Sequence, residues 1–382
     1  MKRRHLFLAM AAASSMAAPA AHAGVDLGTV AGSEVSVEGI VQTDAYWYDN
    51  DVADLDGDPD DGDAADFGLR RAELVLKGKG PGAFDWTVGY DASGDGKFLD
   101  AYGRWKFGGE LSPYLQVGQF KQPNGMEELS SGRNNDFIAK ALVSNTFAVG
   151  RRLGVGTGIS GDTWGLTGSI FSRELTHDRA HGPGHGVRGW WAPMHGDGNV
   201  LHLGLSHVDH DTDADTLRVH ARPGADMANR LVDTGTFTDA DRVATTGFEA
   251  LWLRGPVKLQ GEYMRSRVTR LGSAGDFAGS GGYISGVWNL SGETWDYKGG
   301  TPSTPKAAEP GSGMWQLGLR YDALDLDDGA IAGGSLDTLT AGVNWYLQKN
   351  FKFALDYVKV ASDRRGVSDD PSILEARMQL HW

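Results

Sequence analysis

The feature that most constrains this chain is an alternation of apolar and polar residues with a period of two. In the last ten residues, ILEARMQLHW, every second residue from Leu374 to Trp382 is apolar and the residues between them are polar. Successive side chains of a β-strand point to opposite faces, so this segment would form a ribbon with one apolar and one polar face. Such a ribbon fits a soluble sheet, and it also fits a barrel wall between lipid and water.

Segments with this alternation, each about ten residues long, recur along the whole chain. Ten residues is the length that a tilted strand needs to cross a membrane, whereas most strands average about five or six. Beyond residue 23 no apolar run approaches the ~18 residues of a membrane-spanning helix, which leaves a closed barrel as the way to cross a bilayer. The pattern predicts sixteen strands, at 34–48, 67–78, 83–92, 99–108, 113–121, 151–160, 163–172, 186–194, 199–208, 245–254, 256–265, 282–291, 313–322, 337–347, 351–361 and 373–382.

The connections between these segments alternate between long and short. Long connections are expected at 49–66, 122–150, 173–185, 209–244, 323–336 and 362–372, and short turns at 79–82, 161–162, 195–198, 255 and 348–350. Bacterial outer-membrane barrels have long external loops and short periplasmic turns. One segment, 292–312, is long on the side of the short turns. The sequence therefore predicts an all-β fold, a transmembrane β-barrel of about 16 antiparallel strands, with a secreted β-sandwich or β-solenoid as the alternative.

The N-terminus indicates export. Residues 1–23 combine a basic start, an apolar run and the small-x-small sequence Ala21-His22-Ala23, which is typical of a cleaved signal peptide. The barrel would then be formed by residues 24–382 in the bacterial outer membrane. The chain has no cysteine, which excludes disulfides and thiolate chemistry, and its net charge of −14 argues against nucleic acid as a partner.

Several segments resemble the phosphate-selective porin O/P family, in the same order along the chain. They include FGLRRAELVLKG at 67–78, LQVGQFKQPNGMEELSS at 115–131, RGWWAPMHGDGNVLHLGLSH at 188–207 and AGVNWYLQKNFKFALDYVKV at 341–360. The resemblance implies a homotrimeric sixteen-stranded porin in outer-membrane lipid and lipopolysaccharide, through which small anions such as phosphate or polyphosphate diffuse passively. It also implies that the third external loop, 122–150, folds into the lumen and narrows it. No cofactor or metal is expected.

Charged residues on this loop and on the adjacent wall would form the constriction, because rings of charge are how pores select ions. Alternation places the wall members in the lumen, since a charge facing lipid would cost roughly 2–4 kcal/mol near the bilayer midplane. The resemblance matches a basic wall residue to Arg71 and an acidic one to Asp100. The candidate site residues are Arg71, Asp100, Arg133, Lys140, Arg151 and Arg152.

Two departures from the family pattern weaken the expected anion preference. Glu128 stands where the phosphate-selective members have a lysine, and Thr87 replaces another basic wall residue. Adding a carboxylate to a narrow throat opposes its attraction for anions. The alternatives therefore stay open: a phosphate or other anion channel, a general diffusion porin without anion preference, or a non-conducting barrel with a surface or structural role.

Other motifs favour ordinary loops. The acidic segment 49–63 has alternating aspartates but lacks the glycine and terminal glutamate of an EF-hand, so we expect a solvated loop, loosely associated at most with divalent ions. His181 and His185 lie in a predicted external loop without a metal-binding motif. No GxSxG sequence accompanies Ser172, His177 and Asp178, so the chain is not expected to be an enzyme.

Overall fold

The computed structural model describes residues 24–56, 64–176, 182–309 and 311–382. The predicted signal peptide at 1–23 lies outside the described residues, as do 57–63 of the acidic segment and two of the loop histidines, His177 and His181. None of the helices in the described part of the chain is long and apolar enough to cross a membrane.

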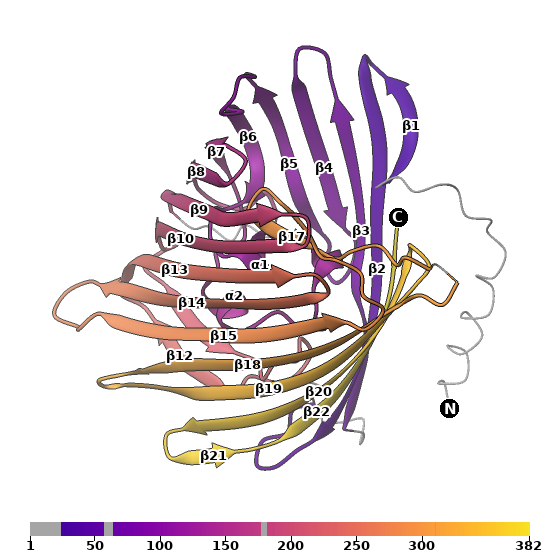
Figure 1. Ribbon diagram of the computed structural model, residues 1–382. Helices are drawn as coiled ribbons and strands as arrows, with labels where there is room; N and C mark the ends of the chain where they lie inside the picture. The colour runs from indigo at the N-terminus through magenta and orange to yellow at the C-terminus, as the bar shows by residue number, and fades with distance from the viewer. Residues whose placement is uncertain (1–23, 57–63, 177–181, 310) are drawn as a thin grey trace.

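Sixteen antiparallel strands form one closed wall (Figure 1). The last strand pairs with the first, from Ile40 opposite His381 to Asp49 opposite Ser372, so the wall has no free edge. This confirms the predicted sixteen-stranded barrel. In order around the wall, the strands are β2 Ser33–Asp49, β3 Ala65–Lys79, β4 Phe84–Asp91, β5 Lys97–Lys106, β6 Tyr114–Lys121, β7 Arg151–Ser160, β8 Trp164–Phe171, β9 Gly184–Gly196, β10 Asn199–Asp211, β13 Ala240–Arg254, β14 Val257–Arg270, β15 Phe277–Asn289, β18 Met314–Asp328, β19 Ile331–Leu347, β20 Phe351–Arg364 and β22 Ser372–His381.

Short strands and helices lie before the first wall strand and in the connections between wall strands. At the N-terminus β1 pairs with the start of β2, and β21 pairs with the end of β20. Two further hairpins, β11–β12 and β16–β17, lie outside the wall sheet. The bounds of these elements are β1 Val25–Val30, β11 Leu217–Ala221, β12 Val232–Phe237, β16 Asp296–Lys298, β17 Thr301–Ser303, β21 Val367–Asp369, α1 Met126–Leu129, the 3-10 turn η2 Gly132–Asn134 and α2 Leu142–Phe147.

Several strands extend further on the external side than the sequence predicted. The expected loop 323–336 is a continuation of β18 and β19, which leaves only residues 329–330 as the turn. Here Leu324 and Leu326 still face inward and are buried, but the outward residues are Asp325 and Asp327. Beyond the bilayer the outer face meets water, so the strand continues without the apolar face that marks it in the sequence.

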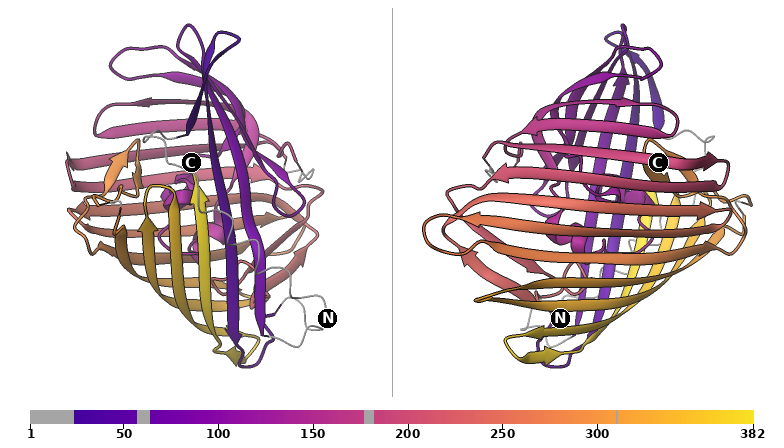
Figure 2. Two further views of the ribbon diagram at one scale, coloured as in Figure 1. Left: turned by 90° about the vertical axis from the view of Figure 1, so that its right-hand side faces the viewer. Right: turned by 60° about the vertical axis from the view of Figure 1, so that its left-hand side comes forward.

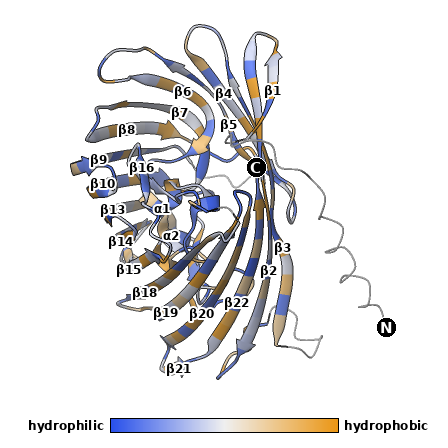
Figure 3. Cartoon of the chain, turned by 45° about the vertical axis from the view of Figure 1, so that its right-hand side comes forward, coloured by the Kyte–Doolittle hydropathy of each residue, from blue (hydrophilic) through white to orange (hydrophobic). Residues whose placement is uncertain are grey.

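The two faces of the wall differ in polarity, and Figure 3 shows apolar and polar residues alternating along the strands. Aromatic residues gather outside at the strand ends nearest the short turns, where Trp315 stacks on Trp345 with ring centroids 5.3 Å apart. At the seam, the ring of Trp382 covers Gly39, and a Cβ there would lie 2.2 Å from the ring. Glycine is therefore required at position 39 if Trp382 is to lie flat on the wall.

The hydrophobic core lies inside the barrel. One cluster joins inward residues of the wall to α2, β12 and the chain near Ala225, and it includes Leu142, Phe147 and Val232. A second cluster joins Met126 and Phe137 of the loop 122–150 to Trp295 and to inward residues of β9, β10 and β13. Figure 2 shows the short helices α1 and α2 within the ring of strands. Much of the lumen is therefore filled by connections that fold back into it.

Candidate functional site

The segment 122–150, called here the inner loop, is bound to one half of the wall by charged groups. The backbone N–H of Ile138 donates to Asp356 on β20 at 2.7 Å, and that of Leu142 donates to Asp322 on β18 at 3.0 Å. Arg377 on β22 donates to the carbonyl oxygen of Ile138 at 2.7 Å. These wall residues are buried, so their hydrogen bonds to the loop satisfy charges that would otherwise be costly inside the barrel.

The start of the inner loop is held by a carboxylate on β14. The two oxygens of Glu262 accept hydrogen bonds from the backbone N–H groups of Met126 and Glu127, at 2.8 and 2.7 Å. These are free donors of the first turn of α1, which a helix of this length cannot pair itself. The Glu127 carboxylate accepts in turn from the N–H of Ala141, and burial raises the pKa of Glu127. The loop is thus fixed at both ends of its helical part.

The other side of the inner loop faces a polar cavity of about 270 Å³, bounded by strands β2 to β7. We call this cavity and its charged lining the eyelet. Five of the six predicted site residues line it: Arg71, Asp100, Arg133, Lys140 and Arg151. Both positions that depart from the family pattern, Thr87 and Glu128, line it as well.

Four charged residues of the eyelet are not among the predicted site residues. Alternation gave a usable signal, because Glu73 and Lys77 share the inward face of β3 with Arg71, and Glu38 lies on the inward face of β2. Lys121 ends β6, where the inner loop begins. The complete charged lining has six basic residues, Arg71, Lys77, Lys121, Arg133, Lys140 and Arg151, and four acidic residues, Glu38, Glu73, Asp100 and Glu128.

Five of the six basic groups of the eyelet form ion pairs with acidic groups. Glu38 binds two of them, Lys77 at 2.7 Å and Arg133 at 2.6 Å. Arg151 binds Asp100 at 3.0 Å. Arg71 binds Glu73 at 2.6 Å, and Lys140 forms an ion pair with Glu128. The eyelet is therefore a ring of ion pairs with a formal excess of two positive charges.

Glu128 interacts with two lysines of the eyelet. Burial alone would raise the pKa of its carboxyl group, but Lys140 and Lys121 outweigh burial and lower that pKa to about 2. Lys121 also donates to the carbonyl oxygens of Glu128 and, at 2.8 Å, of Ser130. Glu128 therefore stays ionised at any pH above about 3, and its charge offsets one of the two lysines that hold it.

Arg152 is the one predicted site residue that lies away from the eyelet. Its neighbour Arg151, the first residue of β7, lines the eyelet, and Arg152 does not. Arg152 is buried and donates to Glu174 at 2.8 Å, in the loop that follows β8. Its contacts are those of a residue that ties the wall to an external loop.

A second segment, 290–313, also folds into the barrel, from the end that carries the short turns. Its hairpin β16–β17 contacts buried, inward side chains of the wall. The hydroxyl of Tyr297 hydrogen-bonds to His202 at 2.6 Å, and Arg188 donates to the carbonyl oxygen of Gly300 at 2.7 Å. The ammonium group of Lys258 lies 4.1 Å from the ring centroid of Trp295. These contacts explain why this connection is long on the side of the short turns.

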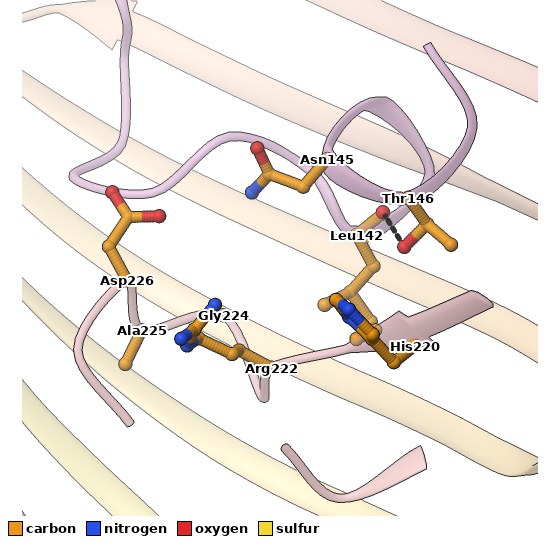
Figure 4. Close-up of a pocket in the computed structure, with 9 residues that line it drawn as sticks. Leu142, Asn145, Thr146, His220, Arg222, Gly224, Ala225 and Asp226 are labelled. Carbon is orange, nitrogen blue, oxygen red and sulfur yellow. Dashed lines mark hydrogen bonds between the residues drawn. The ribbon is translucent and has the colours of Figure 1, made fainter. Parts of the chain in front are cut away.

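External to the inner loop lies a smaller cavity of about 180 Å³, between α2 and the connection that follows β11 (Figure 4). Asn145 and Thr146 line it from α2, and His220 and Arg222 line it from the other side. The connection reaches across the lumen, because Asp226 pairs with Arg70 of β3 at 2.6 Å. The external approach to the eyelet is therefore narrowed by polar chain segments.

Comparisons with known proteins agree with this architecture. Porin O of Pseudomonas aeruginosa is 26% identical over 350 residues, which cover 79% of this chain and 78% of that protein. The anion-selective porin of Comamonas acidovorans superposes with a TM-score of 0.57 at 12% identity, over 92% of this chain and 100% of that one. The trimer form of OmpT from Vibrio cholerae superposes with a TM-score of 0.56 at 10% identity, over 92% of this chain and 100% of that one. At these identities the two structures support the fold alone.

A family model covers nearly all of the barrel. The model of the phosphate-selective porins O and P matches residues 41–382, which includes the inner loop, every charged residue of the eyelet except Glu38, and fifteen of the sixteen wall strands in full. This chain therefore belongs to the phosphate-selective porin O and P family: it is an outer-membrane porin, a channel protein and not an enzyme.

Proposed function

We propose that small hydrophilic solutes diffuse through the eyelet and that the channel has a weak preference for anions. The observation that carries this proposal is the eyelet lining, in which six basic side chains stand against four acidic ones. A cavity of about 270 Å³ has room for small ions. The inner loop would act as the constriction, because its bonds to β14, β18, β20 and β22 leave a passage only on its other side.

Phosphate is one candidate solute, in line with the family to which the chain belongs. However, each of the pairs that involve Arg71, Arg133, Lys140 and Arg151 reduces the charge available to a passing anion. This pairing specifically favours the second candidate, a general diffusion porin with little anion preference. The filling of the lumen by 122–150 and 290–313 favours the third, a barrel that does not conduct.

We also propose that three copies assemble in the outer membrane, as in the trimer form of OmpT, and that the chain is exported by a cleaved leader at 1–23. The partners would then be small anions together with membrane lipid and lipopolysaccharide. The test is gel electrophoresis of the folded protein in detergent after heating to increasing temperatures. A trimer should give one band that converts to the monomer band at one temperature. A single monomer band at every temperature would contradict the trimer.

Planar-bilayer recording tests the channel function directly. Purified protein is added to one side, and reversal potentials are measured in a gradient of potassium chloride, then with phosphate titrated against chloride. Stepwise conductance with a reversal potential displaced toward that of chloride supports the proposal. A reversal potential near zero assigns the general diffusion porin, and silence from folded protein assigns the non-conducting barrel.

A further inference from the structure

The outer surface of the wall carries an apolar groove over β10, β13, β14 and β15. Its floor consists of Ala250 and Gly261, which face each other across β13 and β14. Both residues are small and face outward, so the surface is hollow between larger neighbours, with a volume of about 650 Å³. The groove is bounded by Leu203, Phe248, Trp252, Leu259, Tyr263 and Ile284.

The groove faces lipid. Alternation turns Glu249 and Glu262 into the lumen, where both are buried, and leaves Phe248 and Ile284 outside with exposed fractions of 57% and 64%. Tyr263 is the last apolar outward residue of β14, because Arg265, Arg267 and Thr269 follow it on the same face. A hollow at this depth is filled by hydrocarbon, because water in contact with so much apolar surface would be unfavourable.

A free cation lies directly above the groove. Arg265 follows Tyr263 by two residues on the same outward face of β14, so its Cα is only about 7 Å further along the strand. Among the described residues its side chain makes no ion pair or hydrogen bond, whereas Arg267, two residues further, is bound to Asp276 at 2.6 Å. Thr246 stands opposite Arg265 and bonds to His207 at 2.9 Å, so this level of the wall is polar.

We propose that this site binds one lipid A molecule of the outer leaflet, with an acyl chain in the groove and a phosphate on Arg265. The groove lies at the depth of the lipid hydrocarbon, and the guanidinium group of Arg265 lies at the membrane interface. The acyl chains and phosphates of lipid A are arranged in the same order. A guanidinium presents two parallel donors that match phosphate oxygens. The inference concerns the outer face of the barrel and does not depend on whether the eyelet conducts.

The test is native mass spectrometry of the purified, full-length protein with bisphosphorylated hexa-acyl lipid A and with a fully dephosphorylated form. We expect one bound lipid A per protomer and weaker binding of the dephosphorylated form. Arg265→Gln should raise the apparent Kd about tenfold or more, because a charge-assisted hydrogen bond is lost. Ala250→Phe, which fills the floor, should abolish the specific adduct with both lipids.

Two variants serve as matched controls. Arg254→Gln removes an outward arginine from the periplasmic end of β13, and Ala341→Phe adds the same bulk to an outward position of β19. Both should bind lipid A as the wild type does. The proposal is overturned if Arg265→Gln binds lipid A as tightly as the wild type does. It is also overturned if the two controls weaken lipid A binding as much as Arg265→Gln and Ala250→Phe do.

A second copy of the chain is the competing occupant of the groove. The chain has no cysteine, so Ala250→Cys introduces a single thiol at the floor. If lipid covers the groove, mild oxidation should leave the protomers unlinked. Disulfide-linked dimers would instead assign the groove to an interface between copies and overturn the lipid site.

Discussion

Replacing Glu128 by glutamine should make the channel about fivefold more selective for anions over cations. The eyelet volume of about 270 Å³ corresponds to a radius of about 4 Å, so a permeating ion passes about 5 Å from the charge of Glu128. At that distance a unit charge contributes about 0.8 kcal/mol in water, or about 0.5 kcal/mol after screening at 0.1 M salt. Removing this charge raises the permeability for an anion about 2.3-fold and lowers that for a cation by the same factor, which gives the fivefold change in their ratio.

The assay is the reversal potential of single channels in a salt gradient, from which the permeability ratio is obtained. Glu128→Lys changes the charge by two and should shift the ratio about 25-fold. Glu110→Gln is the matched control, since it removes one exposed carboxylate from a short turn and should leave the ratio unchanged. A folded, conducting Glu128→Gln channel with the wild-type ratio would refute the assignment of the eyelet as the selectivity site.

Three further predictions concern charged side chains inside and outside the eyelet. Lys140→Glu should lower anion over cation permeability, because it places a second carboxylate beside Glu128; an unchanged reversal potential would contradict its role. Arg152→Gln should lower the thermal midpoint of the folded barrel, since Glu174 loses its partner, while selectivity stays constant; altered selectivity would return Arg152 to the pore. Because the pKa of Glu128 is lowered to about 2, its ion pair is fully present above the ordinary carboxyl range and is lost only as the pH falls through about 2. The contribution of Glu128 should thus stay constant from pH 7 to 4, so the permeability ratios of the wild type and Glu128→Gln should differ by the same factor over this range; a difference that disappears near pH 4.5 would show that the pairing is wrong.

The wall could be predicted from the sequence because each strand is in contact with two different solvents. Lipid outside and water inside impose the period-two pattern, as in Leu374 to Trp382, and all sixteen predicted strands are present. The pattern fails where the outer solvent changes. At Asp325 and Asp327 the strand has left the bilayer, so the sequence no longer distinguishes it from a loop.

The eyelet could be predicted only in part, because its geometry is set by contacts between distant residues. Alternation brings Arg71 and Asp100 to the lumen, but nothing local indicates that Arg133 of the inner loop will meet Glu38 of β2, 95 positions away. The same holds for Tyr297, which hydrogen-bonds to His202 although 95 positions separate them. Such pairs depend on how loops fold within the closed wall, and the loops carry no periodic signal.

The seam between β2 and β22 sets a condition on how the protein is made. Asp44 and Arg377 form a buried ion pair at 2.6 Å across the seam, although 333 positions separate them. Until synthesis reaches the final strand, β2 has no permanent neighbour on that side, and its unpaired backbone groups are open to other unfinished chains. The wall can therefore close only after β22 has been synthesised. Until then, β2 must be kept from pairing with other chains.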